Sequence, residues 1–353
     1  MAKSRRRKTM SNQRSVAKYL QIIPAIAMLV GAGLWVKDRL PSLSSSAPST
    51  ATREAQVFTN LGKERRVMVV PNFLPSDLAE AWYAALRDAA AGTGINGSNA
   101  AISPWIYTTN NNGTTAEGGS NAKVRSRTRI PARRRAAREL QAANQFAYSK
   151  WELERNHTVF TQTKRHFERG ATRKAVRSLV AKLTAGSGHA EPALSKKLAD
   201  LFVTWYRAGD FLSPHQDFYS GTVAFVLNLA RGARGEAWKP EYGGSLAFVC
   251  EEEGKQAAWC NQIQPTFNTL VLFRTRSLAP TGGGSVQEYQ QHQQGPMHSV
   301  APVLDAVETD SFYRFALTGW FEEESIVLSE HDKAERAKTR SRGESGSTLK
   351  DEV

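Results

Sequence analysis

The chain has 353 residues, of which 41% are hydrophobic and 23% are charged, and this composition excludes wholly disordered, collagen-like and coiled-coil proteins. Its two cysteines exclude a scaffold built on disulfides and a zinc site of four thiolates, although one disulfide or two free thiols stay open. The net charge of +14 is concentrated in residues 1–53 and in residues 123–138, so a generally basic nucleic-acid binder is not indicated.

The N-terminal segment has the pattern of a membrane anchor. Seven Lys or Arg precede an uncharged stretch at 19–36, whose eighteen residues are just enough to span a bilayer as a helix. Because the basic residues come first, the positive-inside rule predicts a cytosolic tail at 1–18, a single transmembrane helix at 19–36 and the rest of the chain across the membrane. In a eukaryotic cell, this membrane would be the endoplasmic reticulum or another secretory membrane. A cleaved signal peptide and an Arg-rich organelle-targeting peptide are the alternatives.

Composition also predicts where the folded domain begins and ends. Ser, Pro and Thr are abundant after the apolar stretch, which predicts a flexible linker at 37–60. Residues 326–353 are charged and poor in aromatic residues, which predicts a disordered tail. A folded domain is therefore expected at 61–325.

The first half of that domain is predicted to be mainly helical. A short apolar strand at 67–70 is followed by a helix that Ser76 can cap, in which apolar residues recur at four-residue spacing. Residues 91–121 are rich in Gly, Asn, Ser and Thr and predict a long loop. Further helices are expected at 132–155, 171–184 and 193–201.

The pattern changes near residue 201 to short apolar runs that turn residues separate. These runs predict strands at 202–206, 211–217, 222–229, 245–250, 269–273, 298–304 and 312–321. Helices followed by many short strands predict an α+β protein whose core is a β-sandwich or jelly roll.

One pair of residues in this region has metal-ligand spacing. His215 and Asp217 are two residues apart, so on an extended strand both point to the same face and can offer a nitrogen and an oxygen to one ion. His298, at the start of a later predicted strand, is the candidate for a third ligand, and His292 is the alternative. Two histidines and one carboxylate on one side of an octahedral ion form the facial triad of non-haem iron sites. The competing interpretation is a chance pair of surface residues.

The last predicted strand carries a cation where a barrel interior is expected. Arg314 shares one face of this strand with Ala316 and Thr318, whereas its immediate neighbours point the other way. A buried guanidinium needs a partner, and a bound carboxylate suits its two-pronged geometry. Tyr206 could add a phenolic hydrogen bond. A salt bridge to a carboxylate of the protein itself is the alternative.

At these residues the sequence resembles the 2-oxoglutarate- and Fe(II)-dependent dioxygenases, and within them the prolyl 4-hydroxylase-like branch. The resemblance runs from about residue 67 to residue 321, and its specific part lies at 202–321. The matching pieces are Tyr206, His215 with Asp217, Leu227-Asn228, Trp238, Tyr242-Gly243-Gly244 with Leu246, Pro265 to Asn268, Leu270 to Phe273, His298 to Val300, and Arg314 with Thr318 to Phe321.

The resemblance implies a double-stranded β-helix with supporting helices, and a dioxygenase domain at 61–325. It implies Fe(II) held by His215, Asp217 and His298 as catalytic ligands. It implies 2-oxoglutarate as a cosubstrate bound by Arg314, with Tyr206 and Thr318 as helpers, together with O2 and with ascorbate as an optional further cofactor. The expected reaction is hydroxylation of prolyl residues in a protein or peptide, with release of succinate and CO2.

Other functions remain open at this point. A related oxygenase could act on another side chain, a small molecule or a nucleobase, and a non-enzymatic module could use the basic run at 123–138. That run is equally consistent with a solvated helix face, so we do not expect nucleic-acid binding. The sequence does not indicate the oligomeric state.

Overall fold

The structure is a computed structural model, and its described residues belong to one compact unit at 46–353. It describes residues 55–58, 67–91, 103–109, 122–124, 130–143, 145–184, 193–217, 220–250, 258–275, 295–304 and 312–323. The expected cytosolic tail, the expected anchor at 19–36 and the expected C-terminal tail lie outside these residues. None of the helices in the described ranges combines the length and the apolar character needed to cross a membrane.

The described strands form one antiparallel sheet of thirteen strands, and four α-helices accompany it. The helices are α2 (Ser76–Ala91), α3 (Ile130–Ala142), α4 (Thr158–Glu168) and α5 (Gly170–Thr184). The strands are β1 (Gln56–Phe58), β2 (Val67–Val70), β3 (Trp105–Thr109), β4 (Ala122–Val124), β5 (Tyr148–Leu153), β6 (Asp200–Tyr206), β7 (Phe211–His215), β8 (Val223–Arg231), β9 (Leu246–Cys250), β10 (Ala258–Ile263), β11 (Thr269–Arg274), β12 (His298–Val300) and β13 (Tyr313–Phe321).

The sheet curls so that its two halves face each other across a packed interior. The strand order is β1-β2-β11-β8-β13-β6-β5-β7-β12-β9-β10, with β3 and β4 attached beside β5. Side chains from β8, β11 and β13 pack together with side chains from β9, β10 and β12 in one buried cluster, which we call the interior cluster. A curled antiparallel sheet with this core fits the jelly-roll prediction.

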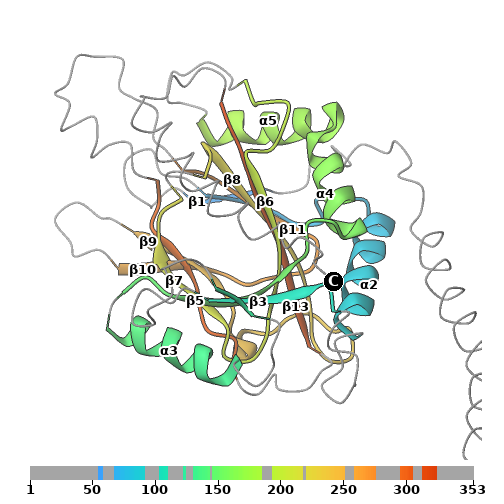
Figure 1. Ribbon diagram of the computed structural model, residues 1–353. Coiled ribbons are helices and arrows are strands. Elements are labelled where there is room, and N and C mark those ends of the chain that lie inside the picture. The colour runs from blue at the N-terminus through green and yellow to red at the C-terminus, as the bar shows by residue number, and fades with distance from the viewer. Residues whose placement is uncertain are drawn as a thin grey trace, which may run out of the picture. The chain divides into compact units, whose positions relative to one another are not determined.

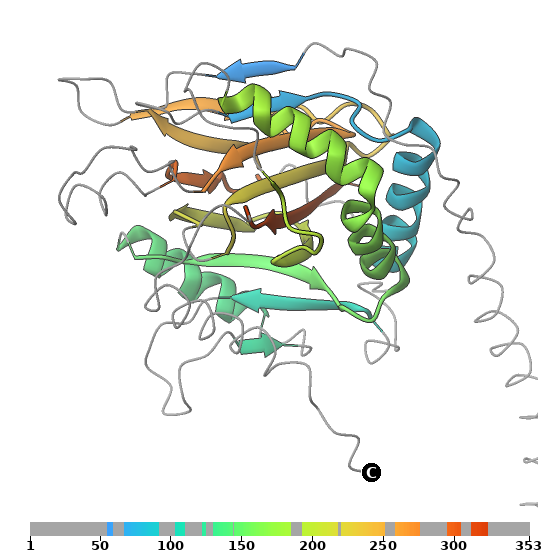
Figure 2. The ribbon, with the colours of Figure 1, turned by 90° about the horizontal axis from the view of Figure 1, so that it is seen from above.

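Helices cover the other face of the sheet. Figures 1 and 2 show α2, α4 and α5 grouped together, while α3 lies apart from them beside β5. The second buried cluster joins these three helices to the outward side chains of β8, β11 and β13, among them Phe315 and Leu317. The apolar stripe predicted in α2 is confirmed, because Trp82 and Leu86 are fully buried there.

Strand β5 corrects the expectation of one helix at 132–155. The helix α3 ends at Ala142, and residues 148–153 instead form a strand that pairs with β3, β6 and β7. Lys150 and Glu152, two residues apart on this strand, form an ion pair of 3.0 Å. The strand bridges β6 and β7, and thereby closes one side of the curled sheet.

Two further local predictions were wrong. The helix expected at 193–201 is absent from this described stretch, because Leu194 and Ser195 run extended against the end of β13 and β6 begins at Asp200. The loop expected at 91–121 contains β3. Near the end of the linker expected at 37–60, Gln56–Phe58 form β1, which pairs with β2, and most of that linker lies outside the described residues. The helix α4 and the strand β10 were not predicted.

The structure also decides between a disulfide and two free thiols, since Cys250 is disulfide-bonded.

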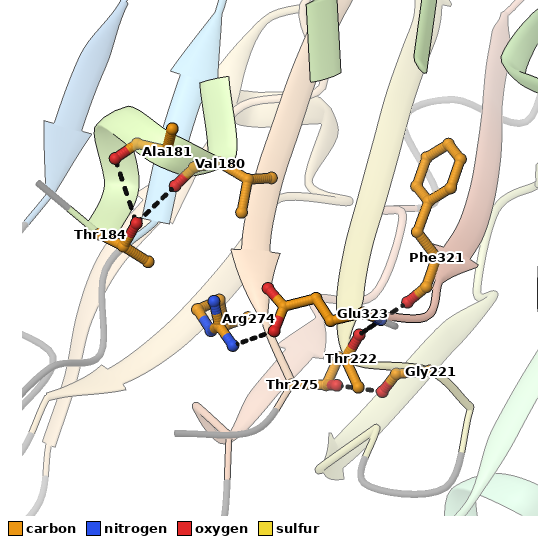
Figure 3. Close-up of polar contacts among 9 residues, drawn as sticks. All are labelled: Val180, Ala181, Thr184, Gly221, Thr222, Arg274, Thr275, Phe321 and Glu323. Atoms are coloured by element: carbon orange, nitrogen blue, oxygen red, sulfur yellow. Dashed lines mark hydrogen bonds and ion pairs between the residues drawn. The ribbon is translucent and has the colours of Figure 1, made fainter. Parts of the chain in front are cut away.

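A buried ion pair joins the ends of two central strands, β11 and β13, as Figure 3 shows. Arg274 ends β11, and its guanidinium lies 2.5 Å from the Glu323 carboxylate just beyond β13. Thr222, before β8, bonds through its hydroxyl to the backbone of both Phe321 and Glu323. These contacts tie β8, β11 and β13 together at one end, which fixes the register of the strands that carry the site.

Candidate metal and cosubstrate site

The three predicted metal ligands come together in space. His215 ends β7, Asp217 follows two residues later, and His298 begins β12 directly opposite His215. The Nε2 atoms of His215 and His298 each lie 3.3 Å from an oxygen of Asp217, and all three ligand atoms lie within 4.8 Å of one another. Two imidazole nitrogens and one carboxylate oxygen in this arrangement could hold a divalent metal ion.

Both histidines are oriented by backbone carbonyls. His215 Nδ1 lies 3.0 Å from the carbonyl oxygen of Ser213, and His298 Nδ1 lies 3.0 Å from that of Pro296. A carbonyl can only accept, so each Nδ1 carries the proton and each Nε2 presents a lone pair. This is the usual way in which a protein fixes the tautomer of a histidine that binds a metal.

A tryptophan from another strand orients the carboxylate. Trp320 of β13 donates its indole N–H to Oδ2 of Asp217 at 3.2 Å. Neither its position in the sequence nor its apolar surroundings marked Trp320 as a site residue. Two signals could have found it: Trp320 lies in the matching segment at 318–321, and it falls on the same alternating face as Arg314 and Thr318.

The charges of the triad are coupled. Burial would raise the pKa of Asp217, but the neighbouring His298 and His215 outweigh burial and hold that pKa well below its usual range. Burial would lower the pKa of His298, yet Asp217 raises it above its usual value, whereas burial and His298 lower the pKa of His215. An ionised carboxylate between two imidazoles is the state that a cation requires.

Arg314 is a buried cation with an unsatisfied donor. The residue is 1% exposed, its Nε donates to the carbonyl oxygen of Gly244 at 2.7 Å, and its Nη1 is buried without a hydrogen-bond partner. Burial lowers the pKa of Arg314 to about 10, so the side chain stays charged at neutral pH. The alternative of a salt bridge is not realised, since Arg314 forms no ion pair with any described carboxylate. A buried guanidinium with a free N–H fits an added carboxylate.

Gly244 makes room for this guanidinium. Its φ of +71° favours glycine, and a Cβ at this position would lie 2.7 Å from Cδ of Arg314. Any larger residue would therefore displace the cation as well as strain the backbone. Gly244 belongs to the matching motif at 242–246, but the sequence analysis predicted no role for it.

Tyr206 and Thr318, the residues expected to assist Arg314, lie at different distances from it along the strands. Tyr206 is the cross-strand neighbour of Arg314, whose Cζ lies 4.4 Å from the centre of the phenol ring. Burial raises the pKa of Tyr206, so its hydroxyl keeps its proton and can donate. Thr318 is half-buried on the face of β13 that carries Arg314, between Phe202 and Val226. Both residues therefore line the interior, Tyr206 directly beside Arg314 and Thr318 four residues further along β13.

Comparison with known proteins finds a family model that matches this region. Residues 201–322 match the model of the 2OG-Fe(II) oxygenase superfamily. The match supports membership of that superfamily. The matched segment contains the triad, Arg314, Tyr206 and Thr318, and the family implies Fe(II), 2-oxoglutarate and O2. The donor set and the unsatisfied Nη1 of Arg314 fit these groups.

Solved structures show only distant likeness, and no curated protein matches the chain. A prolyl-4-hydroxylase of Pseudomonas putida is 17% identical, with a TM-score of 0.35 over 73% of this chain and 92% of its own. OsALKBH1 is 11% identical, with a TM-score of 0.34 over 75% and 98%. A bsmA homolog from Methylobium petroleophilum PM1 is 12% identical, with a TM-score of 0.28 over 74% and 89%. At these values the likenesses add nothing to the assignment.

Proposed function

We propose that this oxygenase domain hydroxylates prolyl residues of a protein or peptide, with Fe(II) bound by His215, Asp217 and His298 and with 2-oxoglutarate bound by Arg314. The observation that carries the proposal is the presence of two binding centres in the same curled sheet. One is the His-Asp-His group, whose ligand atoms lie within 4.8 Å of one another, and the other is the unsatisfied guanidinium of Arg314. A ligand with a metal-binding end and an anionic end, such as 2-oxoglutarate, would satisfy both.

The bound groups would supply the oxidising chemistry, in which 2-oxoglutarate and O2 give succinate and CO2 while a C–H bond of the substrate is hydroxylated. The chain itself binds and orients. His215 and His298 keep Nε2 free for the metal, Trp320 holds the Asp217 carboxylate in place, and Arg314 neutralises a carboxylate that enters the interior. The aromatic residues around His298 exclude water, since Phe248 and Phe273 both contact its ring.

The prolyl substrate is supported by the resemblance of residues 202–321 and by the surface next to the metal ligands. Phe146 is 41% exposed, and its ring centre lies 5.7 Å from that of His215 and 5.9 Å from that of Tyr148. An exposed aromatic face beside a metal ligand suits a compact apolar ring such as that of proline. A strongly charged or extended polar substrate would gain less from this surface.

The experiment is product analysis by mass. The purified chain is incubated with Fe(II), 2-oxoglutarate and a peptide library that contains proline, and peptides that gain one oxygen atom are sequenced by fragmentation. We expect the oxygen on proline, in step with succinate release, and we expect no product from Asp217→Ala. Oxygen on lysine or asparagine, or turnover with metabolites alone, would contradict the prolyl substrate. Absence of succinate under all conditions would contradict the oxygenase itself.

A further inference from the structure

Asn228, in the middle of β8, is a buried amide whose polar atoms have no partner. The residue is 1% exposed, and neither its Nδ2 nor its Oδ1 has a hydrogen-bond partner within the described structure. An unsatisfied buried amide destabilises the fold, because its hydrogen bonds to water are lost and not replaced. Such groups are rare in native proteins and usually have a functional or solvent-filled explanation.

The amide points into the interior of the curled sheet. Asn228 lies opposite Ala316 of β13 and Thr269 of β11. Val226 and Ala230, which flank it at two-residue spacing on β8, both belong to the interior cluster. Alternation along a strand therefore gives Asn228 the same orientation.

Its position in the interior lies between Arg314 and the metal ligands. Arg314 is paired with Ala230, so Asn228 is its diagonal neighbour across the β8–β13 ladder, at a typical separation of about 7–8 Å. Ala316, opposite Asn228, is the next inward-facing residue of β13 after Arg314 in the direction of Trp320. Trp320 bonds to Asp217, so Asn228 lies one step closer to the metal ligands than Arg314 does.

We propose that Asn228 is a second binding residue for the cosubstrate, donating its Nδ2–H to the carboxylate that Arg314 holds. This inference rests on the proposed function and extends it to a residue that the sequence marked only as part of a motif. Water alone would satisfy the amide, but it would leave the charge of Arg314 without a counterion. A carboxylate serves both groups, because its two oxygens accept from a guanidinium and an amide together.

The test measures binding of 2-oxoglutarate to protein loaded with Mn(II), which separates affinity from turnover. Asn228→Leu keeps the volume of the side chain and removes both polar groups. We expect the dissociation constant for 2-oxoglutarate to rise about tenfold, the usual effect of one hydrogen bond to a charged group. Asn228→Asp should weaken binding further, because it places a second carboxylate beside the first. Without 2-oxoglutarate, Asn228→Leu should melt no lower than the wild type, since the lost groups made no hydrogen bonds.

Thr163→Val is the matched control. The Thr163 hydroxyl is also buried without a partner, but it belongs to α4 on the helix side of the sheet. This variant should bind 2-oxoglutarate as the wild type does. Unchanged affinity in both Asn228→Leu and Asn228→Asp, with normal binding by the wild type, would overturn the inference and leave the proposed function standing. A wild-type protein that binds Mn(II) but not 2-oxoglutarate would overturn the proposed function as well.

Discussion

Arg314 and Trp320 share one face of β13, and each serves a different part of the site. Arg314 points its unsatisfied Nη1 into the interior, whereas Trp320 donates its indole N–H to Asp217 at 3.2 Å. One strand therefore sets both the position of the proposed cosubstrate anchor and the orientation of a proposed metal ligand. Any shift in the register of β13 would move the two together.

The bond from Trp320 predicts a loss of metal affinity in Trp320→Phe. Phenylalanine keeps an aromatic ring at the position but cannot donate to Asp217. Partners that orient metal ligands are typically worth about 10–100-fold in affinity, and we expect a decrease in this range for Mn(II), measured by titration calorimetry. Trp82→Phe is the control, because the Trp82 N–H is buried without a partner and Trp82 lies in α2, on the helix side of the sheet. Equal Mn(II) affinity in both variants would show that the bond does not orient Asp217.

The buried guanidinium of Arg314 predicts how the rate of succinate formation depends on the concentration of 2-oxoglutarate. Breaking a charge-assisted pair in a buried site costs about 2–5 kcal/mol, so Arg314→Ala should raise the apparent constant for 2-oxoglutarate at least about tenfold. Metal binding should largely survive, because Arg314 contacts none of the three ligands. Initial rates of succinate formation at a series of 2-oxoglutarate concentrations give the constant. Arg135→Ala, which removes an exposed arginine of α3, serves as the control, and an unchanged constant in Arg314→Ala would reject the anchor.

The triad predicts that metal affinity rises with pH. Burial alone would lower the pKa of His298, but Asp217 raises it, so in the metal-free protein His298 holds a proton to a higher pH than an ordinary histidine. A metal ion must displace that proton from Nε2. Affinity for Mn(II) should therefore increase as pH rises through the raised pKa and level off above it, and each binding event should release protons. Calorimetry in buffers of different ionisation enthalpy measures both effects. An affinity that does not change between about pH 5 and 8 would contradict this coupling.

The local chemistry of the site could be predicted because it depends on short spacings. Strand alternation predicts that His215 and Asp217 point to the same face. It also predicts that Arg314 and Thr318 lie on one face of their strand, and Phe315 and Leu317 on the other. The structure confirms the alternation, since Phe315 and Leu317 lie in the cluster beneath the helices while Arg314 faces the interior. These relationships need no knowledge of the rest of the fold.

Features set by distant contacts could not be predicted. The strand pattern after His298 favoured it over His292, but its place opposite His215 depends on the pairing of β12 with β7. The roles of Trp320 and Gly244 arise from contacts with residues far away in the chain. Strand β5 was mistaken for helix for the same reason, because its neighbours β3, β6 and β7 decide its conformation and the local pattern does not.

The N-terminal pattern predicts a membrane protein with a cytosolic N-terminus. In membrane vesicles from a eukaryotic host, the full chain should resist extraction by carbonate, and residues 60–325 should resist added protease until detergent is supplied. Deletion of residues 1–40 should leave a soluble protein with its oxygenase activity, since every site residue lies far beyond this segment. A mature N-terminus just after residue 36 would instead identify a cleaved targeting peptide. Digestion without detergent would reverse the proposed orientation.

The most direct test of the central claim is succinate formation from 2-oxoglutarate by the wild type and by single-alanine variants of the histidines and of Asp217. The account predicts turnover that requires Fe(II) and O2, that is lost in His215→Ala, Asp217→Ala and His298→Ala, and that survives in His292→Ala. Each inactive variant should keep the melting temperature of the metal-free wild type within a few degrees, so that loss of the ligand and not unfolding explains the result. Turnover that persists in His298→Ala but disappears in His292→Ala would contradict the metal centre described here.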